Sequence, residues 1–473
     1  MAHEVRIPAV PAEPARVRRW SVVSAARRLG SRFWTLFSST TVSNLGDGVG
    51  RVALPLLAAT LTRDPILVGS LVSFSFVPWL LFALISGALV DRIDRRKAMI
   101  GANLVRAVIV GGLGLIVLAG GAQIWMLYIA AFLLGAAETL YDSAARAMLP
   151  SVIDRDQLER GNGRMEASEV VSQEFLGAPL GSLLFVLVAA GPFLANSAGF
   201  LVAALLLFAL PGSYRAVPKA AESTAESGSA AEPSAERTPA SRSLRAEIAE
   251  GLRWLWAHRL LRPLMLLTGL VTVALEASMA LVVLLVVDEL NLSEAIFGLF
   301  ALAMGLGGLL AGLVAGVVTS RLPRAVVLVA SVALAGLSVL AIGVLPGPIL
   351  AAAMLTLSAL FIVLFNVITM SLRQAVIPAS LFGRIQGAYR TVIWGLMPLG
   401  GLLGGLIASV AGLRAVYLVS GIALLGTSVA FWLLVRRPDV DLSNLHNPDD
   451  AEPDESMPAA APTHTEDATE PRA

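Results

Sequence analysis

Apolar residues in this chain are gathered into about twelve continuous runs, and each run is long enough to cross a lipid bilayer. A transmembrane helix needs about 20 residues to cross a hydrocarbon layer of roughly 30 Å. Transmembrane strands would instead alternate apolar and polar residues in pieces of about ten. The pattern therefore predicts spanning helices at residues 34–61, 66–90, 98–119, 123–148, 167–190, 192–211, 262–287, 294–319, 324–345, 348–376, 385–410 and 413–435.

The composition indicates an integral membrane protein of the all-α class. Hydrophobic residues make up 56% of the sequence and charged residues only 15%, whereas soluble domains average about 25% charged residues. The sequence contains no Cys and its four His lie outside the spans, so we expect no disulfide and no metal site. The formal net charge is only +1, with cations and acids in separate segments, and we expect no nucleic-acid partner.

Cations are concentrated in alternate loops between the predicted spans. One set of loops contains Arg92, Arg95, Arg96, Lys97, Arg155, Arg160, Arg164, Arg321, Arg324, Arg373 and Arg384, with Arg436 and Arg437 after the last span. The other set is nearly free of cations, with Arg63 and Arg414 as the exceptions. By the positive-inside rule the first set faces the cytoplasm. We therefore expect a multi-pass protein of the cell membrane with both termini in the cytoplasm.

A long polar stretch in the middle of the chain divides the spans into two bundles of six helices. Residues 213–243 are rich in Ala, Ser, Glu and Pro and predict a flexible cytoplasmic linker. Residues 244–259 then place Leu and Ile at helical spacing among charges, which is typical of an interfacial amphipathic helix. The remaining segments are a basic N-terminal segment (1–32), the two bundles (33–212 and 260–437) and an acidic tail that we expect to be disordered (438–473).

Matching residues in the two halves indicate an internal duplication. The loop at residues 87–96 aligns without gaps on residues 316–325, with one Gly and two Arg in common. Pro179-Leu180-Gly181 in the fifth span likewise matches Pro398-Leu399-Gly400 in the eleventh. Duplicated halves of a transporter enclose a site near the middle of the membrane. We therefore expect a central cavity between two homologous bundles.

The loop between the second and third spans carries the pattern Gly87-x-Leu89-x-Asp91-Arg92-x-x-Arg95-Arg96. It resembles the loop GxLxDRxGRR of the major facilitator superfamily, with Asp94 in place of the usual second Gly. Ser43-Asn44-Leu45-Gly46-Asp47-Gly48 and Pro378-x-x-Leu381-x-Gly383-Arg384 are similar to the macrolide-efflux and enterobactin-exporter branch. The resemblance covers residues 32–437. It implies a twelve-helix transporter that works by alternating access, not an enzyme.

Charged residues inside the spans are candidates for coupling and substrate binding, because charge at membrane depth is costly. Asp47 lies in the middle of the first span, four residues before Arg51. This spacing puts the two side chains on one helical face. Either Asp47 exchanges a proton while Arg51 holds its charge or contacts an anionic substrate, or the two residues form a structural ion pair.

Glu138, Asp142 and Arg146 recur every four residues on the fourth span and form one polar stripe. Glu138 and Asp142 suit a proton relay. Asp142 and Arg146 instead suit an ion pair that locks a gate near the cytoplasmic surface. Both interpretations remain open from the sequence.

Two further acids lie within the spans. Glu174 is the deeper acid of the fifth span, and Glu276 is the clearest acid of the second half, with Arg390 and Arg106 as candidate partners. Either residue could titrate or could be a protonated structural group. Large apolar side chains that would line a cavity, or simply pack, are Phe74, Phe76, Trp79, Trp394 and Met397.

The charged loop also predicts a conformational gate. Gly87 would let the second span approach the eleventh, and Asp91 would face the N-terminus of the eleventh span near Gly383, where the helix dipole favours an anion. We expect Asp91→Asn to weaken the outward-open state in a distance measurement. The other residues of this predicted gate are Arg92, Arg95, Arg96, Arg146 and Arg384.

These features together predict a secondary active exporter of an amphipathic small molecule, a drug-like compound or secondary metabolite, driven by proton antiport. The alternatives are an exporter of a siderophore or lipid-like metabolite, an uptake permease, and a membrane receptor or scaffold without transport. The sequence has no nucleotide-binding Gly-x-x-x-x-Gly-Lys-Ser/Thr pattern, so an ATP-driven pump is not expected. We expect no cofactor beyond the proton gradient, and a monomer whose partners are substrate, protons and lipid.

Overall fold

The computed structural model describes residues 29–90, 92–154, 157–215, 253–377 and 379–437. Within these ranges the regular elements are all helical. Eleven helical stretches are long and apolar enough to cross a membrane, and the more polar α1 (Ser31–Leu61) has a similar length. The predicted all-α fold with twelve spans is confirmed.

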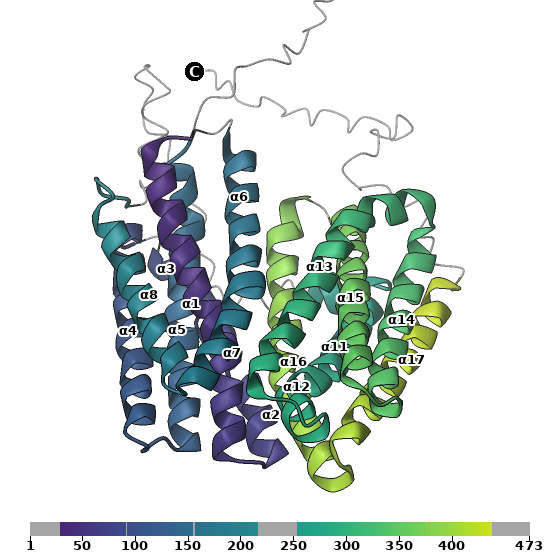
Figure 1. Ribbon diagram of the computed structural model, residues 1–473. Helices are drawn as coiled ribbons and strands as arrows, with labels where there is room; N and C mark the ends of the chain where they lie inside the picture. Colours follow the sequence, from purple (N-terminus) through teal and green to yellow (C-terminus); the bar gives the residue numbers. More distant parts are fainter. Residues whose placement is uncertain (1–28, 91, 155–156, 216–252, 378, 438–473) are drawn as a thin grey trace, which may run out of the picture.

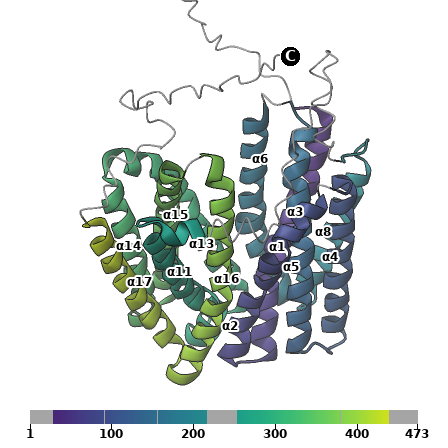
Figure 2. The same ribbon diagram turned by 180° about the vertical axis from the view of Figure 1, so that it is seen from behind.

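The helices form two bundles that lie side by side, one for each half of the sequence (Figure 1 and Figure 2). The N-terminal bundle contains α1, α2 (Pro65–Phe74), α3 (Val77–Val90), α4 (Arg95–Leu118), α5 (Ile124–Met148), α6 (Leu158–Val170), the π-helix η3 (Val171–Gly177), α7 (Ala178–Leu187) and α8 (Gly191–Phe208). The C-terminal bundle contains α11 (Leu261–Met279), α12 (Val282–Leu284), the π-helix η5 (Leu285–Glu289), α13 (Glu294–Arg321), α14 (Arg324–Val344), α15 (Pro348–Val376), α16 (Ala379–Ala411) and α17 (Leu413–Val435). The pairs α4 with α8 and α14 with α17 pack at equivalent places in the two bundles, as a duplication requires.

Two spans that the sequence predicts as single helices are broken next to proline. The second span divides into α2 and α3 at residues 75 and 76, because Pro78 has no N–H to donate to the carbonyl of Phe74. In the fifth span η3 ends directly before Pro179 enters α7, since Pro179 cannot donate to the carbonyl of Phe175. Both breaks fall in helices of the N-terminal bundle that contact the C-terminal bundle.

The contact between the bundles, which we call the seam, joins α2 to α16 and α7 to α13. Glycines bring these backbones together. A Cβ atom on Gly69 would lie 2.7 Å from the carbonyl oxygen of Gly401, and one on Gly298 would lie 2.7 Å from the carbonyl oxygen of Ala178. Both approaches lie where α1 ends and α2 begins, which we call the far end. The seam is therefore closed by backbone contact at the far end.

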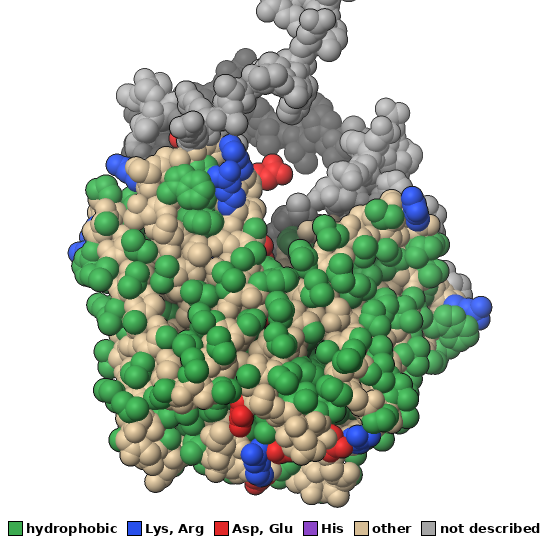
Figure 3. Space-filling view, in the orientation of Figure 1, with side chains coloured by type: hydrophobic (Ala, Val, Ile, Leu, Met, Phe, Trp, Pro, Cys, Tyr) green, Lys and Arg blue, Asp and Glu red, His purple; other side chains and the backbone are tan. Residues whose placement is uncertain are grey.

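The opposite end, where α8 ends and α11 begins, is the linker end, and there the bundles are apart (Figure 3). Among the described residues, no atom outside the glycine's own stretch of helix lies within 4 Å of a Cβ position at Gly87, Gly316 or Gly387. Between α3 and α16, the described contacts of the seam include that of Trp79 with Trp394, whose ring centroids are 5.3 Å apart. The predicted approach of Gly87 to the eleventh span is thus not made in this conformation. Asp91 and the side chain of Arg384 lie outside the described part of the structure.

The two cations that break the alternation of loop charges both have acidic partners. Arg63 pairs with Asp288 and so joins the two bundles at the far end. Arg414 donates its Nε–H to Oε1 of Glu289 at 2.6 Å. Each exception is a single arginine in its loop, against clusters of cations in the other set of loops, so the bias that sets the predicted orientation remains.

Asp94, which replaces a Gly of the superfamily loop pattern, caps the N-terminus of α4. Its carboxylate accepts the backbone N–H of Arg96 at 3.0 Å and the hydroxyl of Ser213 at 2.7 Å. Burial acts to raise the pKa of the Asp94 carboxyl, but hydrogen bonds from Ser213 and from backbone N–H groups outweigh it and lower the pKa below its ordinary value. Asp94 therefore ties this loop to the chain that leaves α8.

The neighbouring arginines bind the ends of helices in their own bundle. Arg95 Nη1 donates to the carbonyl of Ala147 at 2.8 Å, and Arg96 Nε donates to the carbonyl of Leu207 at 2.7 Å. These carbonyls belong to the last turns of α5 and α8, where a cation is favourable. Among the described residues, the hydrogen-bond partners of the Arg95 and Arg96 side chains all belong to the N-terminal half of the chain, while Arg92 is exposed.

Residues 1–28, 216–252 and 438–473 lie outside the described residues. They include the acidic tail and most of the predicted N-terminal segment, linker and amphipathic helix. Of that helix, residues 253–257 are helical. Leu255 there is buried and Trp256 is exposed.

Candidate functional site

The N-terminal bundle contains an ion pair between Asp47 of α1 and Arg106 of α4. The Arg106 side chain is 1% exposed and that of Asp47 14% exposed. The predicted pair of Asp47 with Arg51 is wrong. A spacing of four residues permits that pair, but a fully buried guanidinium needs a carboxylate, and Asp47 is the one that Arg106 binds.

Groups from three other positions enclose the charge of Arg106. Its Nη1 donates to the hydroxyl of Ser43 on α1 at 3.3 Å. The guanidinium lies 4.2 Å from the ring centroid of Phe200 and 5.4 Å from that of Tyr141, at distances suited to cation–π attraction. Arg106 is therefore not the partner of Glu276, which belongs to the other bundle.

Arg51 binds the fifth span and not its own helix. Its Nη1 contacts Oε1 of Glu174 at 2.5 Å, and its Nη2 donates to Oε1 of Gln173 at 2.7 Å. Both partners lie in η3. A Cβ atom on Gly305 of α13 would lie 2.9 Å from Cβ of Glu174, so this ion pair sits beside the seam.

The polar stripe of α5 lies next to the Asp47–Arg106 pair. The charges of Asp47 and Arg106 act on the carboxyl groups of both Glu138 and Asp142. No ion pair joins Asp142 to Arg146, although the structure describes both side chains. The predicted lock between them is thus not formed in this conformation, in which the linker end is open.

A cavity of about 180 Å³ opens at this stripe toward the linker end. Asp142 and Arg146 line it from α5, and Glu166 and Glu169 line it from α6. Asn44 contributes an amide from α1. The cavity thus brings the polar stripe of α5 together with two further acids, Glu166 and Glu169, of α6.

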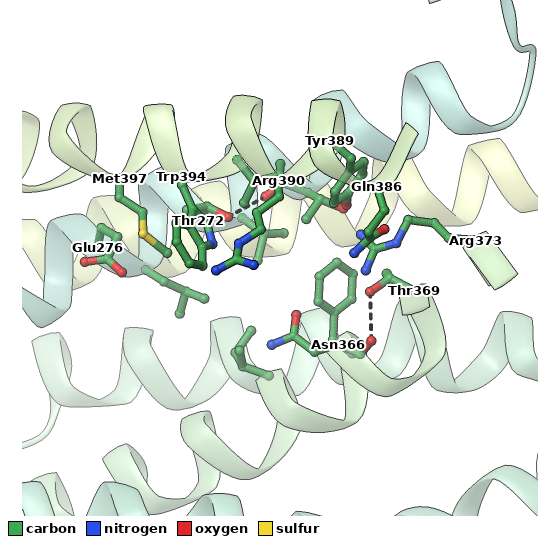
Figure 4. A pocket seen from close by; sticks show the side chains of 16 residues that line it. Thr272, Glu276, Asn366, Thr369, Arg373, Gln386, Tyr389, Arg390, Trp394 and Met397 are labelled. Carbon is green, nitrogen blue, oxygen red and sulfur yellow. Dashed lines mark hydrogen bonds between the residues drawn. The ribbon is translucent and has the colours of Figure 1, made fainter. Parts of the chain in front are cut away.

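A larger cavity of about 350 Å³ lies in the C-terminal bundle between α11, α15 and α16 (Figure 4). Trp394 and Met397, two of the predicted lining residues, border it together with Glu276 and Arg390. The Arg390 guanidinium lies 3.8 Å from the ring centroid of Trp394. Among the described residues Glu276 has no ion-pair partner, so its predicted pairing with Arg390 is wrong. Trp394 holds that guanidinium instead.

Sequence reasoning missed Arg373 as a cavity residue. It was counted among the loop cations, but it lies inside α15 and is 8% exposed. Its guanidinium stacks 4.0 Å from the ring centroid of Tyr389. The sequence did indicate a buried position for Arg373, because this residue falls within the predicted span 348–376, where a cation is expected to face the bundle interior.

The sequence model of the Major Facilitator Superfamily matches this chain over residues 36–397 and 264–453. The chain belongs to this superfamily. A solved structure, the nucleoside transporter NupG, superposes with a TM-score of 0.67 over 86% of this chain and 100% of its own, at 12% identity. That likeness shows the superfamily fold alone.

Several superfamily relatives align with the chain. Macrolide efflux protein A of Streptococcus pyogenes is 22% identical, over 87% of this chain and 98% of its own length. The multidrug efflux pump Tap of Mycobacterium tuberculosis is 26% identical, over 88% and 96%. An MFS-type transporter of Mycobacterium tuberculosis is 32% identical, but over only 40% of this chain and 43% of its own length. The chain is thus a multi-pass membrane transporter of the superfamily, not an enzyme, with efflux pumps among its relatives.

Proposed function

We propose that the protein exports amphipathic small molecules from the cytoplasm in exchange for protons. The observation that carries this proposal is the Asp47–Arg106 pair with Glu138 and Asp142 beside it. Three carboxyl groups share one fully buried cation, Arg106, and the other two arginines whose charges act on them, Arg51 and Arg146, are exposed. The one buried cation cannot neutralise all three carboxyl groups when they are ionised. One of these carboxyl groups can therefore bind a proton while another stays ionised and paired with Arg106.

The exchange works through redistribution of the Arg106 charge. A proton on Asp47 removes the attraction that holds Arg106 to α1. Glu138 of α5 then becomes the carboxylate that balances the cation, which changes the force between these two helices. Each unit charge moved through 100 mV is worth about 2.3 kcal/mol, so one or two titrating carboxyl groups supply useful coupling.

The conformation fits one half of an alternating cycle. The far end is closed by the glycine contacts of the seam, and the linker end is open. The predicted placement of the basic loops puts the linker end in the cytoplasm. With that orientation the open end of the transporter faces the cytoplasm, as uptake of a cargo for export requires. Efflux activity in the relatives named above supports the same direction.

Export can be tested in cells that lack other exporters, with a panel of amphipathic compounds and with or without an uncoupler. Glu138→Gln is the test variant, and Glu159→Gln, an exposed acid in the first turn of α6, is the matched control. We expect uncoupler-sensitive export in the wild type and the control and its loss in Glu138→Gln. Export that continues undiminished with the uncoupler contradicts proton coupling. Flux of no compound in any variant favours a receptor or scaffold.

A further inference from the structure

The cavity of the C-terminal bundle contains buried polar groups that the proton path does not use. Arg373 is 8% exposed and Tyr389 is 4% exposed, and both line the cavity. Within the described residues, Nε of Arg373, the hydroxyl of Tyr389 and Oε1 of the neighbouring Gln386 have no hydrogen-bond partner. Buried polar atoms are normally paired. Of these three atoms, the Nε–H of Arg373 is a donor that an anion can accept from, whereas Oε1 of Gln386 is an acceptor, and the Tyr389 hydroxyl lies close to Thr268 and Arg373.

The cavity also has more positive than negative charge. Its lining contains two guanidinium groups, from Arg373 and Arg390, and one carboxyl group, from Glu276. Figure 4 places Glu276 beside Met397, at the end of the cavity opposite Arg373. Among the described residues neither arginine has an ion-pair partner. Both guanidinium groups stack on aromatic rings instead. Arg373 Nη2 also donates to the sulfur of Met370 at 3.4 Å, a weak acceptor, so an anion would compete for that N–H group only with a thioether.

We propose that this cavity binds the anionic group of the transported molecule between Arg373 and Arg390. The planar guanidinium groups suit a carboxylate, sulfonate or phosphate, which they bind through paired N–H groups. Trp394 and Phe365 supply the apolar wall for the rest of the molecule. The cargo is therefore an amphipathic organic anion. This inference rests on the proposed export function for the identity of the ligand as cargo.

The site also lies against the seam. Trp394, which carries the Arg390 guanidinium, contacts Trp79 of the N-terminal bundle within the seam. A ligand held by Arg390 would therefore lie beside Trp394, which contacts the N-terminal bundle at this point.

Equilibrium binding of two dyes tests the site. Fluorescein and rhodamine 6G share a xanthene ring system but carry opposite charge at neutral pH. Fluorescence anisotropy would be measured with the full chain in nanodiscs of phosphatidylcholine, a lipid without net charge. We expect fluorescein to bind at least about tenfold more tightly than rhodamine 6G. Arg373→Gln and Arg390→Gln should each weaken fluorescein binding about tenfold, the usual effect of losing a charged hydrogen bond.

Two further variants make the result interpretable. Arg373→Lys keeps the charge and should retain part of the affinity, and Arg321→Gln, an exposed arginine outside the cavity, should change nothing. Because Arg373 is buried, its loss could unfold the bundle. Arg390 is exposed, so Arg390→Gln tests the same site in a protein whose gel-filtration profile should be unchanged.

Two results would overturn the anion site: rhodamine 6G bound as tightly as fluorescein, or fluorescein affinity that is indifferent to Arg390→Gln. Absence of fluorescein binding would overturn it as well. These results would leave the export proposal intact, because that proposal is tested by uncoupler-sensitive efflux. Loss of efflux with fluorescein binding retained would contradict the export function and not the site.

Discussion

Replacement of Gly69 by Val should force the far end of the transporter to open. A Cβ atom at this position would lie 2.7 Å from the carbonyl oxygen of Gly401 and 3.3 Å from Cδ2 of Leu281. Gly69 belongs to α2 and both neighbours to the C-terminal bundle. The carbonyl cannot rotate away as a flexible side chain would, so the clash is relieved by separation of the bundles.

The size of the effect follows from the cost of overpacking. Extra methyl groups in a tightly packed contact cost about 1–3 kcal/mol, and this cost falls only on the state with the far end closed. The equilibrium should therefore move toward the far-end-open state by about 5-fold to 150-fold. The Arg63–Asp288 pair also joins the bundles there, but its side chains are 56% and 31% exposed. Such a pair contributes only about 0.2–1 kcal/mol, so Arg63→Gln should have much less effect.

Spin-label distances measure this equilibrium, and the absence of Cys from the sequence makes labelling straightforward. Gln123→Cys with Ser293→Cys reports the far end, and Arg160→Cys with Arg321→Cys reports the linker end. In Gly69→Val the far-end distances should lengthen and the linker-end distances should shorten. Gly101→Val is the control, because no atom lies within 4 Å of a Cβ at Gly101. Unchanged distance distributions in Gly69→Val would refute the assignment of the seam as the closed gate.

Two predictions concern the charged groups of the N-terminal bundle. Arg106→Met should lower the unfolding free energy by about 3–5 kcal/mol, because it leaves Asp47 unpaired, and adding Asp47→Leu should restore much of the loss. If thermal unfolding showed instead that the effects of the two substitutions add, the Asp47–Arg106 pair would be contradicted. Asp94→Ala should cost about 0.5–2 kcal/mol at neutral pH. The pKa of Asp94 is lower in the folded state than its ordinary value of about 4. The Asp94 carboxylate therefore stabilises the fold above that ordinary value, and this stabilisation is lost as the pH falls through the folded pKa. The melting temperatures of wild type and Asp94→Ala should thus converge in acid. A constant difference would contradict this.

The fold follows from local properties of the sequence, whereas the partners of its charges do not. Run length and hydrophobicity are enough to find the spans, because lipid requires every spanning segment to satisfy its own backbone. Even the proline breaks in the second and fifth spans have local causes in Pro78 and Pro179. The role of the seam glycines, by contrast, could not be predicted from local sequence, because it depends on which helix each glycine faces.

The partners of the charged residues could not be predicted from the sequence. Asp47 and Arg51 have the spacing of a helical ion pair, but each binds a residue of another span, Arg106 and Glu174. Helix spacing reports only which residues share a face, not which helix lies opposite. Arg373 was recoverable, because its position inside a predicted span already marked it as buried.

Proton movement linked to substrate movement is the central claim, and proteoliposomes measure it directly. Vesicles containing the full chain and the pH indicator pyranine would be loaded with a compound selected by the efflux panel and diluted into buffer without it. As the compound leaves, antiport predicts that protons enter and pyranine fluorescence falls, and that Glu138→Gln abolishes the fall. Exit of the compound at the same rate without any change in internal pH would contradict the account.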